Sequence, residues 1–444
     1  MTALLSGGHL FSTIARVFKT PDLRTKILFT LGIIVIYRIG VFIPAPSVDY
    51  GNVQMCLAQG DTTGGLYSFV NMFSGGALLQ VSIFALGIMP YITAAIITQL
   101  LRVVIPAFER LQKEGPEGQA RLTQYTRYLT VGLALLNATT IATLARSGAL
   151  LNCNVSLLNN DGIWATLILV MTLAVGAIVI MWMGEQITER GVGNGMSLMI
   201  FVSIAAGFPS GLAAIWQTQG WRIFVIVFII GIATMMLIVF VEDSQRRVPV
   251  QYARRQIGRR TVGSNSTYIP IKVNMAGVIP VIFASSILML PQILIQFNMP
   301  TDGSEPAPWV VWLQEYFGTG SHPVYMTIFF LMTIFFTYFY VTITFNPQDV
   351  SDNMKRQGGF IPGVRAGRPT VQYLEYVISR VTFVGATYLG LIAMIPLVAF
   401  VLIGADQNFP FGGVSILIMV GVALNTIKQI DAQMEQRHYE GLLR

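Results

Sequence analysis

The sequence predicts an all-α membrane protein with ten transmembrane helices, and three observations support this fold class. Hydrophobic residues make up 54% of the 444 residues and charged residues only 11%, less than half of the roughly 25% found in soluble proteins. Ten apolar stretches approach the roughly 20 residues that cross a bilayer. The alternating segments of a membrane β-barrel are absent, so the spans are expected to be helices, which satisfy their own backbone hydrogen bonds in lipid.

The ten stretches define the expected spans. They fall at 26–44, 78–105, 125–145, 163–183, 196–216, 223–241, 273–297, 324–345, 376–403 and 412–427. Before them, residues 1–25 carry apolar side chains at helical spacing with basic residues between, which is typical of an amphipathic helix on a membrane surface.

The basic residues predict the orientation. If the N-terminus is cytoplasmic, 25 of the 28 Lys and Arg residues lie on the cytoplasmic side, and the other three, Arg38, Arg146 and Arg222, lie at the outer ends of spans. By the positive-inside rule this bias predicts that both termini are cytoplasmic. It also favours an even number of spans.

Ionisable residues are missing from the apolar cores of the spans, except for Arg38. Ion-coupled transporters usually place such residues at mid-membrane. The sequence has no phosphate-binding P-loop, no metalloprotease motif and no catalytic triad. Cys56 and Cys153 have no metal-ligand spacing. We therefore expect a passive conduit or a subunit driven by a partner, with no catalytic residues, no cofactor and no metal.

A short apolar segment, residues 65–76, is helix-compatible but cannot span a bilayer. It ends at Ser74-Gly75-Gly76, where glycine gives the backbone freedom. A half-helix folded back into the protein is allowed where it lines a cavity, so the segment predicts a small mobile element in a funnel. The alternative is an interfacial amphipathic helix.

Two spans contain a similar glycine-to-proline motif, Gly87-Ile88-Met89-Pro90 and Gly277-Val278-Ile279-Pro280. Proline removes a helix hydrogen bond and permits a bend. One such span in each half of the chain hints at an internal pseudo-symmetric repeat.

Two cytoplasmic loops are too charged to be simple connectors. The first carries six arginines between 246 and 260, and the second, residues 358–368, is rich in Gly and Pro around Arg365. Arginine-rich projections suit phosphate backbones and acidic partner surfaces. The alternative is that they set topology and bind anionic lipids.

Six motifs follow one another along the chain. They are the sequences at 71–77 (NMFSGGA), 84–92 (FALGIMPYI), 124–128 (QYTRY), 184–191 (GEQITERG), 272–280 (KVNMAGVIP) and 359–365 (GFIPGVR). Together, in this order, they resemble the SecY family of protein-translocation channels. The resemblance covers essentially the whole chain.

This resemblance implies two pseudo-symmetric halves of five helices around a central hourglass pore. Its constriction would be a ring of apolar side chains, namely Ile88, Ile92, Met196, Ile200, Ile282 and Ile418. Met196 stands where the family usually has isoleucine, and remains apolar. The half-helix would be a plug that includes Leu66, Phe69, Met72, Phe73, Ser74, Gly75 and Gly76.

The resemblance also implies a lateral gate and docking sites. The gate would lie between spans two, three, seven and eight, with the polar candidates Thr93, Gln99, Asn137, Asn274, Ser285 and Ser286. Docking would use Arg254, Arg255, Arg259 and Arg365. Ala366 replaces the common proline after that last arginine.

The implied function is a protein-conducting channel that passes unfolded secretory polypeptides across the membrane and releases hydrophobic segments sideways into lipid. The implied partners are the small subunits SecE and SecG, the SecA motor ATPase, the ribosome, signal peptides and nascent chains. The implied location is the bacterial inner membrane. A secondary transporter and an insertase without an open pore are the competing hypotheses.

The predicted layout follows from these assignments. It comprises an amphipathic segment 1–25, an N-terminal half 26–216 that includes the plug, span six at 217–242, a basic loop 243–272, spans seven and eight at 273–345, a loop 346–375, spans nine and ten at 376–427, and a tail 428–444.

Overall fold

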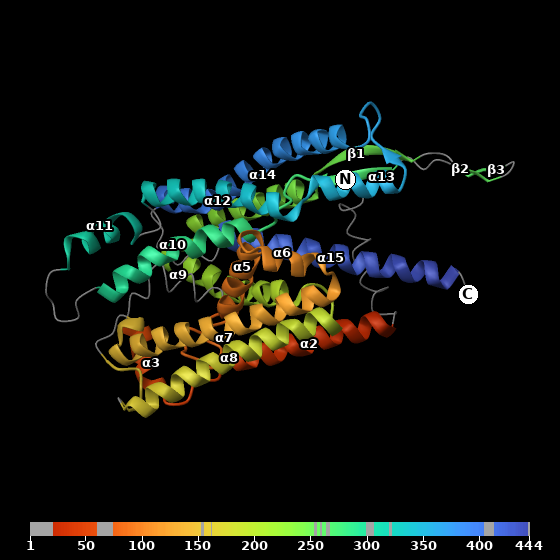
Figure 1. The fold of residues 1–444 in the computed structure, drawn as a ribbon. Helices are drawn as coiled ribbons and strands as arrows, with labels where there is room; N and C mark the ends of the chain where they lie inside the picture. The colour runs from red at the N-terminus through yellow and green to blue at the C-terminus, as the bar shows by residue number, and fades with distance from the viewer. Residues whose placement is uncertain are drawn as a thin grey trace. The chain divides into compact units, whose positions relative to one another are not determined.

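The protein is largely helical (Figure 1). The computed structural model describes residues 21–59, 74–151, 155–160, 162–252, 255–257, 260–262, 267–298, 306–318, 322–403 and 413–442. The chain forms two compact units that divide at Gly220, and residues Val422–Arg444 belong to the first unit. The division falls between the predicted fifth and sixth spans.

The first unit holds the helices that precede Gly220. They are α2 (Pro21–Val41), α3 (Tyr50–Gln59), α5 (Met89–Val104), α6 (Pro106–Lys113), α7 (Pro116–Ser147), the short 3-10 helix η1 (Ala149–Leu151), α8 (Ile163–Arg190) and the first part of α9 (Gly195–Asp243). Helix α9 is broken at Gly220, whose φ of 77° is not helical. Two membrane-length pieces result, Gly195–Gln217 and Gly220–Asp243.

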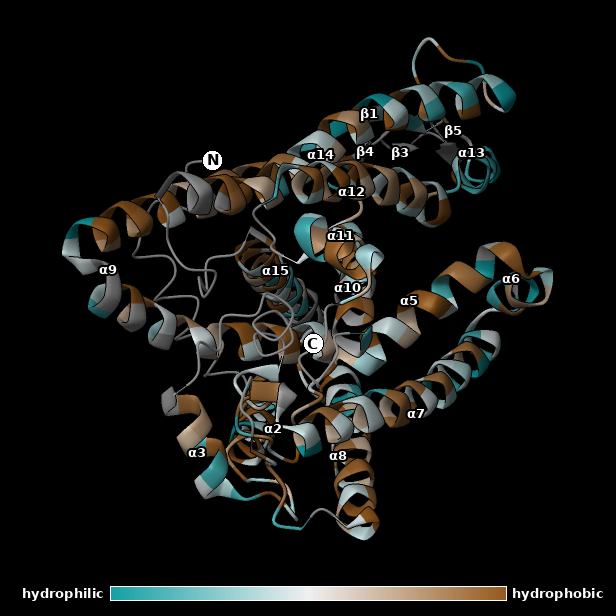
Figure 2. Ribbon diagram, turned by 90° about the vertical axis from the view of Figure 1, so that its left-hand side faces the viewer, coloured by the Kyte–Doolittle hydropathy of each residue, from teal (hydrophilic) through white to brown (hydrophobic). Residues whose placement is uncertain are grey.

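The second unit holds the rest of α9 and most of the later helices. These are α10 (Ile279–Asn298), α11 (Pro308–Phe317), α12 (Pro323–Thr344), α13 (Pro347–Arg356) and α14 (Arg368–Ile403), together with the start of α15 (Gly413–Leu442). Helix α12 presents hydrophobic residues along its length (Figure 2). Its Leu331 and Phe335 are 58% and 59% exposed, which is typical of a surface that faces lipid.

Within the described residues, seven helices are long and apolar enough to cross a membrane, or eight if the bent pair α5 and α6 counts as one span. Helix α2 is not among them because it carries charged residues near both ends, Asp22, Arg24 and Lys26 at its start and Arg38 near its end. The helical membrane fold is thus confirmed. The number ten stays a prediction.

Small residues let the helices of the first unit approach closely. On α7, Ala134, Ala138, Ala142 and Ala145 recur at intervals of three or four and are all fully buried. This spacing places them on one face of the helix. Helices α7 and α8 lie side by side (Figure 1), and the core between them also contains Leu169 and Leu173.

The second unit contains a small β-sheet that the sequence analysis did not predict. Strands β4 (Thr267–Lys272), β1 (Gln245–Tyr252) and β5 (Gly359–Phe360) pair antiparallel in that order. Strand β1 alternates, with Val248 and Val250 buried. They pack in a core with Ile361, Leu374 and other apolar residues. The two predicted cytoplasmic loops therefore meet in one folded projection.

Candidate pore segments and cytoplasmic docking site

The predicted second span, 78–105, is not one continuous helix. Residues 75–88 form turns, interrupted by a β-bridge between Ser82 and Pro44, and α5 begins at Met89. Four positions in this stretch have positive φ, Gly75, Gly76, Val81 and Gly87, a conformation that interrupts any α-helix. Pro90 lies in the first turn of α5, where a proline starts a helix without losing a hydrogen bond. The predicted bend at Pro90 was therefore wrong.

The glycine-to-proline motifs of the two units have the same local structure. Gly87 has φ 56° and Gly277 has φ 61°. In both motifs the helix starts two residues later, and proline is its second residue: α5 begins Met89-Pro90 and α10 begins Ile279-Pro280. This agreement supports the internal repeat that the sequence suggested.

The six predicted ring residues divide between the units, four in the first and two in the second. Ile88 is the N-cap of α5 and Ile92 lies one turn later. Met196 and Ile200 have the same spacing of four on α9, which places each pair on one face of its helix. Met196 is partly buried, whereas the five isoleucines are each at most 9% exposed.

Of the predicted plug residues, Leu66, Phe69, Met72 and Phe73 lie outside the described residues. Ser74, Gly75 and Gly76 are described, and they are held by the first unit. The Tyr37 hydroxyl lies 3.3 Å from the Ser74 carbonyl oxygen, and Arg38 Nη1 donates to the Gly75 carbonyl oxygen at 3.1 Å. The chain therefore leaves the predicted plug through a fixed junction.

The predicted gate residues are also divided between the units. Thr93, Gln99 and Asn137 belong to the first, and Asn274, Ser285 and Ser286 belong to the second. The hydroxyl groups of Ser285 and Ser286 form hydrogen bonds within their own helix. Both donate to the Ile282 carbonyl oxygen, at 3.0 and 2.8 Å. Asn137 is exposed on α7.

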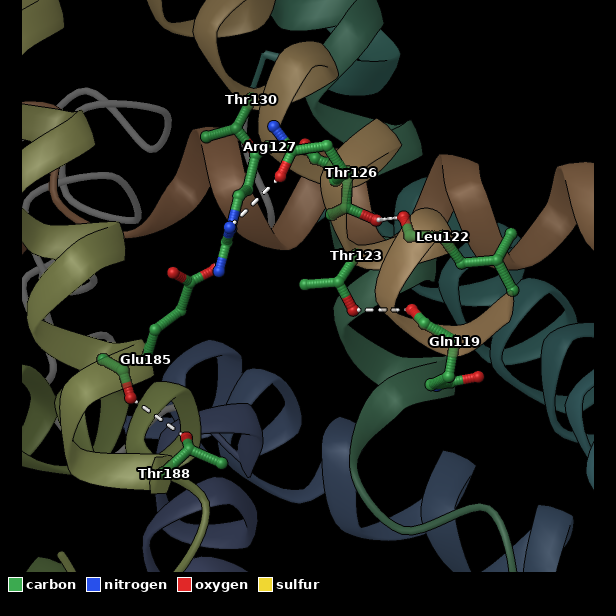
Figure 3. A network of polar contacts seen from close by, with 10 residues as sticks. Gln119, Leu122, Thr123, Thr126, Arg127, Thr130, Glu185 and Thr188 are labelled. Atoms are coloured by element: carbon green, nitrogen blue, oxygen red, sulfur yellow. Dashed lines mark hydrogen bonds and ion pairs between the residues drawn. The ribbon is translucent and has the colours of Figure 1, made fainter. Parts of the chain in front are cut away.

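Sequence reasoning missed polar contacts that link α7 to α5 and to α8. Figure 3 shows the residues of α7 and α8 that take part. Thr126 Oγ1 on α7 donates to Thr98 Oγ1 on α5 at 3.1 Å, and both side chains are buried. One residue further, Arg127 Nε donates to Glu185 Oε1 on α8 at 2.8 Å. The only available signal was that Arg127 and Glu185 both lie in family-like motifs.

A second missed contact fixes a predicted gate residue. Asn274 Nδ2 donates to Glu242 Oε2 at 3.0 Å and to the Gly277 carbonyl oxygen at 3.2 Å. Asn274 and Glu242 are 4% and 7% exposed. The Asn274 amide thus joins the end of α9 to the turn that starts α10, within the second unit.

Of the predicted docking arginines, Arg254 and Arg259 lie outside the described residues. Arg255 begins strand β2 (Arg255–Ile257), which pairs with β3 (Arg260–Val262) in a hairpin. Arg365 is exposed and follows the three-stranded sheet directly, since β5 ends at Phe360.

The backbone around Arg365 is fixed on both sides. Before it, Val364 N donates to the Ile361 carbonyl oxygen at 3.0 Å in a tight turn, and Ile361 is 2% exposed. After it, Thr370 Oγ1 donates to the Arg365 carbonyl oxygen at 2.9 Å. The guanidinium is thus carried into solvent on a rigid tip.

Among the described residues, no three His, Cys, Asp or Glu side chains are grouped so that they could hold a metal ion.

Two units of long apolar helices, each with a glycine-to-proline helix start, and a basic folded sheet define a multi-pass helical membrane protein. Solved structures have the same fold. One, described as a protein conducting channel, has a TM-score of 0.63 at 17% identity and covers 93% of this chain and 92% of its own. Another, of Sec61 in a canine ribosome-channel complex, has a TM-score of 0.61 at 17% identity with the same coverage.

The family model for SecY matches residues 82–427. A relative from Micrococcus luteus, described as protein translocase subunit SecY, is 69% identical over 436 residues, which is 98% of this chain and all of that protein. A relative from Streptomyces scabiei with the same description is 57% identical, again over 98% of this chain. The chain belongs to the SecY family.

Proposed function

We propose that this chain is a protein-conducting channel that passes unfolded polypeptides across the bacterial cell membrane and releases hydrophobic segments sideways into lipid. The observation that carries the proposal is 69% identity over nearly the full length to a protein named as a translocase subunit. The chain supplies neither an energy source nor a reaction centre in its sequence, so the driving force comes from a partner.

An apolar ring explains how such a pore is both sealed and permissive. Ile88, Ile92, Met196, Ile200, Ile282 and Ile418 are all uncharged, and a constriction of such side chains excludes ions because water withdraws from it. A sliding polypeptide of any sequence can displace them, whereas charged side chains would retain some segments too strongly. The plug, residues 65–76, adds a second seal in this proposal.

Release into lipid is a partition step. An apolar signal segment is more stable in hydrocarbon than in an aqueous pore, so opening a lateral gate lets it leave. The gate candidates Thr93, Gln99, Asn137, Asn274, Ser285 and Ser286 are polar but uncharged. Gate and plug act as two-state elements whose equilibrium the signal segment and a cytoplasmic partner bias.

The basic projection supplies the docking site. A ribosome or the motor ATPase SecA presents phosphate or acidic groups, and the exposed guanidinium of Arg365 suits both. Arg254, Arg255 and Arg259 contribute in the same way. SecE and SecG complete the complex in this proposal, anionic lipids surround it, and both termini are cytoplasmic.

The test is reconstitution of the purified chain with its small subunits into liposomes, followed by addition of motor, ATP and a secretory precursor. We expect the precursor to become protected from protease inside the vesicles. Solute uptake that an ion gradient drives, with no protected precursor, would establish a secondary transporter instead. Insertion of membrane segments without any translocated soluble domain would favour an insertase.

A further inference from the structure

Helix α11 carries a stripe of three aromatic side chains. Trp309, Trp312 and Tyr316 are spaced by three and four residues, which places them on one face of the helix. Trp309 and Trp312 are 49% and 55% exposed, and Tyr316 is half-buried. The ring centres of Trp312 and Tyr316 lie 5.1 Å apart. The stripe is therefore an exposed aromatic surface whose side chains already contact one another.

The opposite side of α11 attaches the helix to the second unit. Val310 is fully buried, and α11 lies against α10 and α12. Gln314 and Glu315, the polar residues of the helix, are exposed. A helix that combines an apolar stripe with exposed polar residues is typical of the membrane interface. Trp and Tyr are enriched at this depth, because each joins an apolar ring to a polar group.

The place of α11 along the second unit fits the same depth. Helix α11 precedes the start of α12, whereas Val341, near the end of α12, packs with Val248 and Val250 of the β-sheet. Figure 1 shows α11 near one end of α12 and β1 near the other. The 22 residues of α12 extend over about 33 Å, close to the hydrocarbon thickness of about 30 Å. Since the sheet carries the predicted cytoplasmic loops, α11 lies at the outer interface.

The aromatic stripe also continues into the surface of α12 that faces lipid. The Tyr316 ring meets the His322 ring edge-on at 5.0 Å. His322 Nδ1 in turn accepts from Val324 N at 3.2 Å and caps α12. Val324 is 37% exposed, and its spacing from the exposed Leu331 and Phe335 places all three on one face of α12. Lipid that covers this face of α12 therefore also reaches the stripe.

From these observations we propose that α11 is an interfacial anchor, whose aromatic stripe binds the phospholipids of the outer leaflet at the boundary between headgroups and acyl chains. The rings lie among the first acyl carbons, and the indole N–H groups donate to ester and headgroup oxygens. Because α11 is attached to α10 and α12, the anchor fixes the depth of the adjoining ends of both helices. The anchor requires the membrane fold, but not the channel function proposed above.

The test measures the depth of single tryptophans in the full complex, reconstituted into phospholipid vesicles. The chain has six tryptophans, and one variant retains only Trp312 while the others become phenylalanine. The vesicles carry bromine, which quenches fluorescence, either near the glycerol end or near the far end of the acyl chains. Acrylamide quenches from the water. We expect Trp312 to lie about 5–10 Å inside the headgroup boundary, so that the shallow bromines quench it most.

Two control positions, each in a chain without other tryptophans, calibrate the depth. Phe335→Trp replaces a 59% exposed ring on α12, about 18 Å along the helix from Pro323, and the deep bromines should quench it most. Tyr268→Trp replaces a 47% exposed ring on β4, and acrylamide should quench it most. A second measurement retains the other five tryptophans, since the difference between the unmodified complex and Trp312→Phe reports the quenching of Trp312 alone.

Three results would overturn the anchor. Quenching of Trp312 mainly by acrylamide would place α11 in water. Strongest quenching by the deep bromines would place it inside the hydrocarbon. Protection from bromine and acrylamide alike would mean that a protein partner covers the stripe. The fluorescence needs neither motor nor precursor, so a complex that translocates nothing would refute the channel function and leave this test intact.

Discussion

Arg127 Nε lies 2.8 Å from Glu185 Oε1, and this ion pair joins two long helices of the first unit. The two side chains are 38% and 15% exposed, so the carboxylate is the more deeply buried partner. A second ion pair, Arg121 with Glu117, lies within α7 and is far more exposed, at 61% and 80%. The chain thus offers an internal comparison between an inter-helix and an intra-helix pair.

We expect Arg127→Gln to lower the free energy of unfolding by about 1–2 kcal/mol, a value between those of exposed and buried pairs. The reason is that Glu185 keeps a partly buried charge without its donor. The measurement is a denaturant titration of the purified protein in mixed micelles. Arg121→Gln is the matched control and should change stability by less than about 0.5 kcal/mol. Equal losses in the two variants would contradict this account.

The buried Asn274 amide should contribute substantially to the free energy of unfolding. Asn274→Leu leaves the Glu242 carboxylate without one of its donors in a buried site, and we expect a loss of about 2 kcal/mol or more. Glu242→Gln retains an oxygen that can accept from Asn274, so its loss should be smaller. The same titration compares the two variants. A larger loss in Glu242→Gln than in Asn274→Leu would show that the carboxylate charge, rather than this hydrogen bond, stabilises the turn.

The positive φ of Gly277 predicts a purely conformational penalty. A Cβ at Gly277 meets nothing within 4 Å, so Gly277→Ala creates no clash but places alanine in the left-handed region, at a cost of about 1 kcal/mol. Gly132, inside α7, also has free space for a Cβ. Since it is helical, Gly132→Ala should instead stabilise by about 0.5 kcal/mol. Thermal unfolding midpoints measure both, and shifts of the same sign would refute the explanation.

Hydropathy predicted the helices well because lipid imposes a local rule: roughly 20 apolar residues in a row must be helical. All ten apolar stretches contain a helix or part of one. Hydropathy did not predict the break before α5, because residues 75–88 are as apolar as a transmembrane helix. These residues pack against other parts of the protein, so their backbone need not be helical. In the sequence, only Gly75, Gly76 and Gly87 indicated a non-helical backbone.

Contacts between residues that are far apart in the sequence could not be predicted from such local rules. Glu242 and Asn274 are 32 positions apart, and Tyr37 and Ser203 are 166 apart, so nothing in the spacing pairs them. The β-sheet could have been predicted in part. Val248 and Val250 are two positions apart within a polar segment, a spacing with period two, but Pro249 between them and the high arginine content favoured an interpretation as a loop.

Arg365→Glu should abolish motor-driven or ribosome-driven translocation while the protein still inserts and folds. The side chain is exposed and the backbone is held by Thr370 and the Ile361 turn, so charge reversal alters the surface but not the fold. The measurement is precursor protection in proteoliposomes together with the thermal unfolding midpoint. Arg356→Glu, at the exposed end of α13, is the charge-matched control and should retain most activity. Normal translocation by Arg365→Glu would refute the docking role.

Ion conductance gives the most direct test of the predicted pore ring. Ile88 and Ile200 are 2% and 7% exposed, and if they line the proposed apolar constriction, asparagine at either position would let water remain in it. We therefore expect Ile88→Asn and Ile200→Asn to raise resting ion conductance at least tenfold in planar bilayers. Ile168→Asn is the matched control. The Ile168 side chain on α8 is 45% exposed and is not one of the predicted ring residues, so this variant should leave the resting conductance unchanged. If all three variants leak equally, the ions pass through disturbed lipid packing and not through a gated pore.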